Sequence, residues 1–281
     1  MTHTQLVVLG TALLGLAAGV VGVLAMLRRQ ALLGDVLAHA TLPGLALAFL
    51  LVGSKQIEAL LAGAVLSCMA AAVTVWALDR WTRLKADVRL GLVLSVFFGA
   101  GMAVLGRVQD VPGGGQAGLE AYLFGKPSAM LQRDLVWLST LASVCLLVVT
   151  LCYKEFQVVA FDAAFARAQG WPVRFLDGLL LALIILVVVV GLPVVGVVMV
   201  SAMLILPAAT ARFWTNRLPV LLLLSAWMGA AMGVAGTLIS AQALELPAGP
   251  TIILSGSALF VLSMLLGTKR GLLTRRNKAS R

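Results

Sequence analysis

Residues 177–211 read DGLLLALIILVVVVGLPVVGVVMVSAMLILPAATA, and after the opening aspartate this stretch contains no charged side chain. One straight membrane span needs about 20 apolar residues, so the stretch is too long for a single helix across a bilayer. Three residues that interrupt helices lie in its middle: Gly191, Pro193 and Gly196. The stretch therefore predicts two apolar helices in succession, or one long kinked helix.

The rest of the chain has the same character. It is 61% hydrophobic and only 11% charged, with a mean hydropathy of +1.06, whereas soluble domains are about 25% charged. The bilayer is therefore the expected solvent, and lipid permits only helices or a closed barrel. Apolar runs near 20 residues favour helices over barrel strands. We expect a single all-α transmembrane domain over residues 1–281, with nine spans, or eight if the long stretch does not break: about 6–27, 32–52, 57–78, 90–107, 134–153, 177–191, 194–211, 219–242 and 250–267.

The basic residues predict the orientation. No Lys or Arg precedes the first apolar run, whereas Arg28 and Arg29 follow it, which favours a retained first helix with its N-terminus outside. With nine spans, 17 of the 21 Lys and Arg residues fall in cytoplasmic segments and 4 outside, as the positive-inside rule requires. Eight spans would weaken this bias, so nine are preferred, with a cytoplasmic C-terminus. The net charge of +10 is thus explained by topology, and nucleic acid is not an expected partner.

Two connections are too long to be simple turns, an outer one at about 108–133 and an inner one at about 154–176. The centre of the inner one, Asp162 to Gln169, predicts a short helix with Asp162 as its N-cap and Gly170 as its stop. A short amphipathic helix on the cytoplasmic face is suited to docking a partner protein.

Asp35 and His39 are the ionisable residues placed deepest inside a predicted span. Their four-residue spacing puts both side chains on one helix face. A carboxylate inside a membrane is costly, by about 2.5–3.5 kcal/mol on insertion scales, and usually marks a site or pathway. A carboxylate with an imidazole suits a divalent transition metal. Two alternatives remain: the pair fixes packing only, or Asp35 caps the helix at the membrane surface.

Pro43 follows one turn after His39. It has no N–H to bond the His39 carbonyl, so that oxygen becomes available beside the same face, as in the broken helices of transporters.

Other residues with ligand chemistry fit packing better: the methionine pairs Met199 with Met203 and Met228 with Met232, and the cysteines Cys68, Cys145 and Cys152.

The chain lacks a GxxxxGK[ST] phosphate loop, a nucleophile elbow and an HExxH motif. An enzyme is therefore not expected, and no tightly bound cofactor is implied. Any pumping must draw its energy from another subunit or from an ion gradient.

Four blocks of sequence resemble motifs that occur in the same order in one known protein family: RRQALLGDVLAHATLPGLALAFLL (28–51), LEAYLFGKPSAM (119–130), FDAAFARAQGWPVRFLDGLLLALIILVVVVGLPVVGVVMVSAMLILPAATARF (161–213) and LELPAGPTIILSGSALFVLS (244–263). Together they resemble the ABC-3 family, the permease subunits of ABC importers for manganese, zinc or iron. The blocks span nearly the whole chain. Two positions depart from the usual pattern, since Ala38 replaces a serine and Ala248 a polar residue, and neither is the Asp or His of the motif.

The resemblance implies a permease fold like that of the vitamin-B12 (type II) importers, with fewer helices, in a bacterial cytoplasmic membrane. It implies three partners: a cytoplasmic ABC ATPase subunit, an extracytoplasmic metal-binding protein and a second permease copy, as a homodimer or a related pair. Asp35 and His39 match the family's metal-pathway residues. A coupling helix maps onto Phe161–Gly170, where three residues match its pattern: Asp162, Ala166 and Gly170. The helix breaks expected along the pathway are Pro43 with Gly44 and Pro193 with Gly196.

The sequence therefore predicts an alternating-access importer in which a metal ion passes Asp35 and His39. A gradient-driven secondary cation transporter is the first rival, and the amphipathic inner loop argues against it. A non-transporting membrane scaffold is the second, and it leaves the buried pair unexplained. The pair tolerates Mn²⁺, Fe²⁺ and Zn²⁺ alike.

Overall fold

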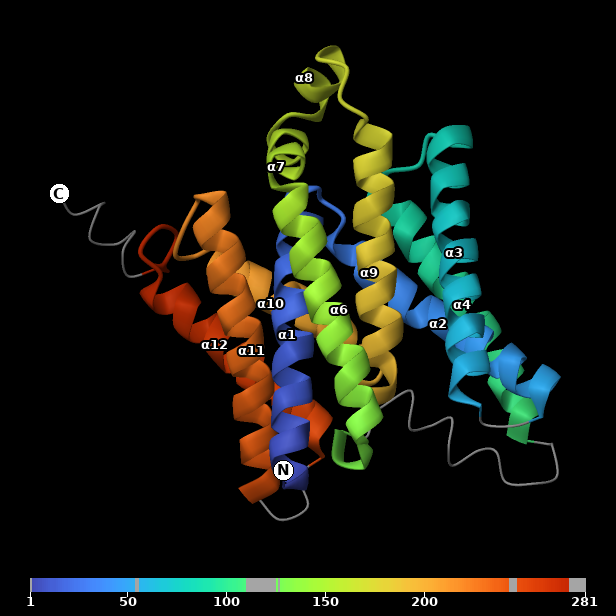
Figure 1. The fold of residues 1–281 in the computed structure, drawn as a ribbon. Coiled ribbons are helices and arrows are strands. Elements are labelled where there is room, and N and C mark those ends of the chain that lie inside the picture. The colour runs from blue at the N-terminus through green and yellow to red at the C-terminus, as the bar shows by residue number, and fades with distance from the viewer. Residues whose placement is uncertain (1, 54–55, 110–124, 126, 243–246, 273–281) are drawn as a thin grey trace.

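The fold is a bundle of helices (Figure 1), seen in a computed structural model that describes residues 2–53, 56–109, 125, 127–242 and 247–272. Within these residues, eight helices are long and apolar enough to cross a membrane: α1 His3–Leu27, α2 Ala31–Val52, α3 Ile57–Trp81, α4 Ala86–Gln109, α6 Gln132–Leu151, α9 Val173–Val195, α11 Leu218–Gln242 and α12 Ala248–Leu266. A ninth apolar helix, α10 (Val197–Ala211), has 15 residues. It extends about 22 Å, less than the hydrocarbon thickness of about 30 Å.

The long apolar stretch breaks as predicted, but at Gly196 and not around Gly191. Pro193 lies inside α9, two residues before its end. Its missing N–H removes a single bond in the last turns, and the helix tolerates that loss. Gly196 takes φ 81°, a left-handed conformation that residues with a Cβ rarely adopt. Backbone geometry at this glycine therefore ends α9 and starts α10.

Small residues let α1 and α11 pack with their backbones in contact. A Cβ atom on Gly15 would overlap the carbonyl group of Gly229, and one on Gly229 would overlap that of Gly15. The Ser225 hydroxyl donates to the Gly19 carbonyl at 2.8 Å, and Thr11 Oγ1 lies 3.0 Å from Thr237 Oγ1. In lipid, close van der Waals packing and such hydrogen bonds drive helix association. Gly15 with Gly19 and Gly229 with Gly233 each form a GxxxG pattern, and the two patterns meet in one buried interface.

A Gly15→Ala substitution should lower the free energy of unfolding by about 1–3 kcal/mol, because the new methyl group overlaps backbone that cannot rotate away. The matched control is Gly106→Ala on α4, where a Cβ meets no atom within 4 Å. That change should be neutral or slightly stabilising. Thermal unfolding of the two purified variants checks the difference, and equal midpoints would refute the interface.

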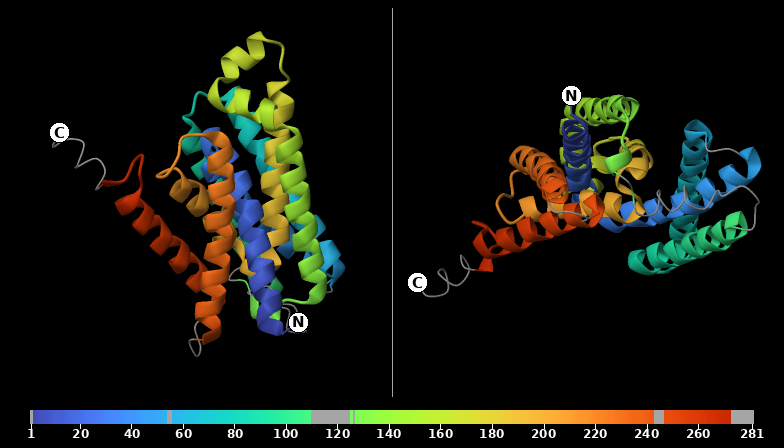
Figure 2. Two further views of the ribbon diagram at one scale, coloured as in Figure 1. Left: turned by 60° about the vertical axis from the view of Figure 1, so that its left-hand side comes forward. Right: turned by 90° about the horizontal axis from the view of Figure 1, so that it is seen from below.

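The helices form two groups joined through α2. Helices α2, α3 and α4 pack on one another, while α1 packs with α6, α10 and α11, and α12 covers α10 and α11. Seen from below, Figure 2 shows α2–α4 on one side and α11 and α12 on the other. Helix α2 reaches the second group through α10 and α9. The pair predicted to bind metal lies on this connecting helix.

The connection at about 154–176 holds two helices where the sequence predicts one. α7 (Tyr153–Phe161) follows α6 after Cys152, and α8 (Ala163–Ala168) follows Asp162. Both lie at the end of the bundle opposite the labelled N-terminus in Figure 1. A short 3₁₀ helix, η1 (Pro127–Ala129), precedes α6. Residues 110–124 and 126, which include Gly113–Gly115 and most of the LFGKP segment, lie outside the described residues.

Candidate functional site

Asp35 and His39 face each other on α2. His39 Nε2 lies 3.6 Å from Asp35 Oδ1, and their side chains are 21% and 33% exposed respectively. The helical spacing brings them together, as the sequence predicts. The distance is slightly too long for a hydrogen bond, so the two groups do not satisfy each other. This leaves room for a third atom to bind both.

The other ring nitrogen of His39 is unusual. Nδ1 is buried and has no hydrogen-bond partner within the described part of the chain. The ring packs edge-on against Phe98 of α4, with centroids 5.2 Å apart and planes at 85°. Buried polar groups are nearly always bonded, so an orphaned nitrogen requires a partner that the described residues do not supply. Packing alone therefore does not explain His39.

One chain offers an incomplete metal site. The described residues contain no group of three or more His, Cys, Asp or Glu side chains placed to hold a metal ion. Transition metals take four or more ligands, and Asp35 with His39 provides two side chains. The remaining ligands must come from water, backbone carbonyls or another copy of the chain. Such partial ligation suits an ion in transit better than an ion held permanently.

The surroundings of Pro43 and Gly44 are closely packed. Helix α2 continues through Pro43 without a break, since the loss of one donor leaves the rest of the ladder intact. The expected interruption of the helix at this position is therefore absent. Gly101 of α4 lies against the Pro43 ring, and Gly44 meets the Gly63 backbone of α3. The two residues thus bring α3 and α4 close to α2 beside the Asp35–His39 pair.

Pro193 and Gly196 lie in the other half of the protein, at the junction of α9 and α10. The backbone of Gly125, with φ 69°, packs directly on Val195 and Gly196. A Cβ atom on Gly125 would overlap the Val195 carbonyl. Gly125, two residues before η1, therefore packs on this junction. It is separate from the Asp35–His39 pair.

The methionines and cysteines with ligand chemistry are packing residues. The thiol of Cys68 donates to the Leu37 carbonyl at 3.3 Å, and Cys145 is fully buried. Met199, Met203 and Met232 are also buried, at 3% exposure or less. Among the described residues, the cysteines also do not join His, Asp or Glu side chains in a group that could hold a metal ion.

The short helix α8 has the local structure that the sequence predicts. The Asp162 carboxylate accepts from the backbone N–H groups of Ala164 and Phe165, at 3.0 and 2.9 Å. Ala166 is fully buried, and Gly170 ends the segment with φ 81°. Phe161 is 62% exposed. Phe165 on α8 is 53% exposed as well, so the segment from Phe161 to Gly170 presents an apolar surface at the end of the bundle.

An ion pair that sequence reasoning missed ties this segment to the spans. Arg28, at the end of α1, donates to both oxygens of Asp177 on α9, with a shortest distance of 2.6 Å. Arg28 Nη1 also donates to the Val159 carbonyl of α7 at 3.0 Å. One side chain thus links three helices. The feature of the sequence that could have indicated this ion pair is Asp177, an acidic residue at the start of an apolar run.

The sequence matches a known protein family and is similar to manganese and zinc transport proteins. The model of the ABC 3 transport family matches residues 1–267. The manganese transport system membrane protein MntC of Bacillus subtilis is 44% identical over 96% of this chain, and the chain spans 62% of that protein. The zinc transport system membrane protein TroC of Treponema pallidum is also 44% identical, over 96% of this chain and 90% of its own length.

Solved structures share the architecture. The structure of PsaBC from Streptococcus pneumoniae in complex with Fab matches 100% of this chain and 96% of its own, with 30% identity and a TM-score of 0.85. A metal-chelate type ABC transporter in an inward-facing conformation matches 92% of this chain and 84% of its own, with a TM-score of 0.70. At 17% identity the second likeness concerns the fold alone. The all-helical importer permease fold that the sequence predicts is confirmed.

Proposed function

Because the chain belongs to the ABC 3 transport family, we propose that it is the membrane permease through which an importer carries manganese or zinc into a bacterial cell. It is a multi-pass membrane protein and a transport permease rather than the ATPase. Its relatives include manganese and zinc systems. The Asp35–His39 pair, with its orphaned Nδ1, is the observation in this chain that supports a metal as the transported substrate.

The proposed pathway passes the Asp35–His39 pair, which acts as a transient ligand or gate. Asp35 is the fifth residue of α2, so it lies about 6 Å along the helix from Ala31. This position is closer to the end of the span than to its middle. A gate near one surface therefore fits better than a binding site at the centre. The metal is bound only in passing, and no tightly bound cofactor is required.

The partners follow from the same proposal. A cytoplasmic ABC ATPase subunit would dock on α7 and α8, where Phe161 is exposed and α8 is capped by Asp162. An extracytoplasmic protein would deliver the ion at the opposite end. A second permease copy would supply the ligands that one chain lacks. The positive-inside rule then puts α7 and α8 in the cytoplasm and the start of α1 outside.

Metal flux into liposomes tests the proposal. The permease is reconstituted with its ATPase subunit and its metal-binding protein, and uptake of Mn²⁺ and Zn²⁺ is measured with ATP, without ATP and with an imposed ion gradient. ATP-dependent uptake is expected. Uptake driven by the gradient without the ATPase would instead indicate a secondary transporter, and no uptake under any condition would favour a scaffold.

A further inference from the structure

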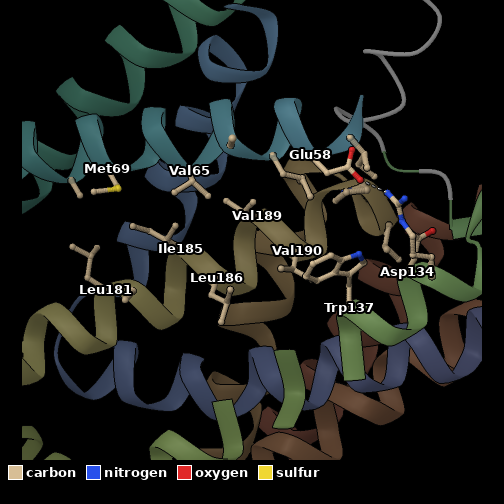
Figure 3. Close-up of a pocket in the computed structure, with 18 of the residues that line it drawn as sticks. Glu58, Val65, Met69, Asp134, Trp137, Leu181, Ile185, Leu186, Val189 and Val190 are labelled. Carbon is tan, nitrogen blue, oxygen red and sulfur yellow. Dashed lines mark ion pairs between the residues drawn. The ribbon is translucent and has the colours of Figure 1, made fainter. Parts of the chain in front are cut away.

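A groove of about 730 Å³ runs between α3, α6 and α9 and does not include the Asp35–His39 pair. In Figure 3, Met69 lies at one end of it and Glu58, Asp134 and Trp137 lie at the other. The lining between them is aliphatic, and every charged side chain in the groove belongs to that second end. The groove is therefore amphipathic along its length.

The groove is long enough to hold an acyl chain that reaches across one leaflet. It follows α9 from Gly178 to Val194, about 24 Å at 1.5 Å per residue. One leaflet of hydrocarbon is about 15 Å thick, half of the bilayer core. The charged end lies in the first turns of α3 and α6, where these spans enter the membrane. Trp137 is 55% exposed beside it, and tryptophan favours the level of the headgroups.

The charged end is suited to a headgroup that carries both signs. Arg133 Nη2 lies 3.2 Å from Glu58 Oε1, and their side chains are 56% and 71% exposed, so each is open to another partner. Asp134 adds a second carboxylate, whose Oδ2 accepts from the Leu131 N–H at 2.8 Å. Two carboxylates against one guanidinium leave an excess of one negative charge. An anionic headgroup would be disfavoured there, whereas a phosphate can bind the guanidinium while an ammonium group donates to the carboxylates.

We propose that this groove binds one phospholipid with a zwitterionic, primary-amine headgroup of the ethanolamine type. Its phosphate contacts Arg133, its ammonium contacts Glu58 and Asp134, and an acyl chain lies along α9. A choline headgroup fits less well, because it has no N–H to donate. The groove lies beside the contact between α3 and α9, so the lipid would add to that contact and stabilise the junction of the two helix groups.

Native mass spectrometry of the full-length permease tests the proposal. The protein is delipidated in detergent and then offered phosphatidylethanolamine, phosphatidylcholine and phosphatidylglycerol in equal amounts. One ethanolamine lipid per chain is expected to be retained, with a rise in the thermal midpoint. Preference for the glycerol lipid, or equal retention of all three, would overturn the proposal.

Two variants examine the two ends of the site separately. Arg133→Ala removes the phosphate ligand, and Ala182→Phe fills the groove from an exposed position on α9. Each should lower the retained ethanolamine lipid by about tenfold or more. Arg107→Ala is the matched control, since Arg107 is exposed at the end of α4 and is not among the residues that line the groove. Unchanged retention in both groove variants, or an equal loss in the control, would also overturn the proposal.

Discussion

Replacing Asp35 or His39 with alanine should lower metal uptake by about 100-fold or more, while the permease still assembles with its ATPase. Each change removes one of the two proposed side-chain ligands, and even outer partners of metal ligands are worth 10–100-fold. Asp35→Asn is the sharper variant, because it keeps the shape and removes the charge. Uptake of ⁵⁴Mn or ⁶⁵Zn into liposomes that contain the full complex measures the effect.

Asp87→Asn is the matched control for the loss of a carboxylate. Asp87 is exposed in the first turn of α4, about 16 Å along that helix from Phe98, which contacts His39. Its replacement should leave uptake unchanged. Normal uptake by the Asp35 and His39 variants would remove the site hypothesis. A loss of assembly in proportion to the loss of uptake would restore the alternative in which the pair serves packing only.

Replacing Arg28 with alanine should uncouple transport from ATP hydrolysis. The side chain links the ends of α1 and α9 to the Val159 carbonyl of α7, next to the proposed docking helix. Its guanidinium and the Asp177 carboxylate are 17% and 32% exposed, so breaking the pair is expected to cost about 2–3 kcal/mol, below the 3–5 kcal/mol of fully buried pairs. Metal transported per ATP hydrolysed should fall about tenfold, since movement of α7 would no longer reach α1 and α9 together.

The neighbouring residue supplies the control for this change. Arg29 has the same charge and is exposed, so Arg29→Ala should transport metal normally. Arg28→Lys should be intermediate, because an ammonium group cannot bind both carboxylate oxygens as the guanidinium fork does. An unchanged ratio of metal to ATP in Arg28→Ala would contradict the linking role, whatever happens to stability.

Local patterns in the sequence were sufficient to predict the long apolar helices and to place Asp35 and His39 on one helix face. Apolar runs of this length indicate segments that lie within the bilayer, so the nine predicted spans match the eight long apolar helices and α10 within a few residues at most ends. The four-residue spacing brings Asp35 and His39 to one face because it depends only on helix geometry. The capping of α8 by Asp162 is equally local, and the structure has it as predicted.

Contacts between distant segments could not be predicted in this way. Gly15 and Gly229 each belong to a small-residue pattern that is frequent in membrane helices, and neither pattern indicates which other helix it packs against. The ion pair of Arg28 with Asp177 depends on how the end of α1 and the start of α9 lie relative to each other in the fold. The break at Gly196 depends on a backbone angle, where the sequence offered two glycines and a proline of similar merit. Tertiary packing decided each of these.

The interface between α1 and α11 has a consequence for biogenesis. The Gly19 carbonyl and the Ser225 hydroxyl that bonds it are 206 residues apart, so the ribosome reaches the partner roughly 10–40 s after it makes α1, at about 5–20 residues per second. During that interval the glycine face of α1 can only contact lipid or other early helices. Helix α1 therefore completes its packing only after α11 has been made, and deletion of α11 and α12 should leave an incompletely packed chain for membrane quality control to remove.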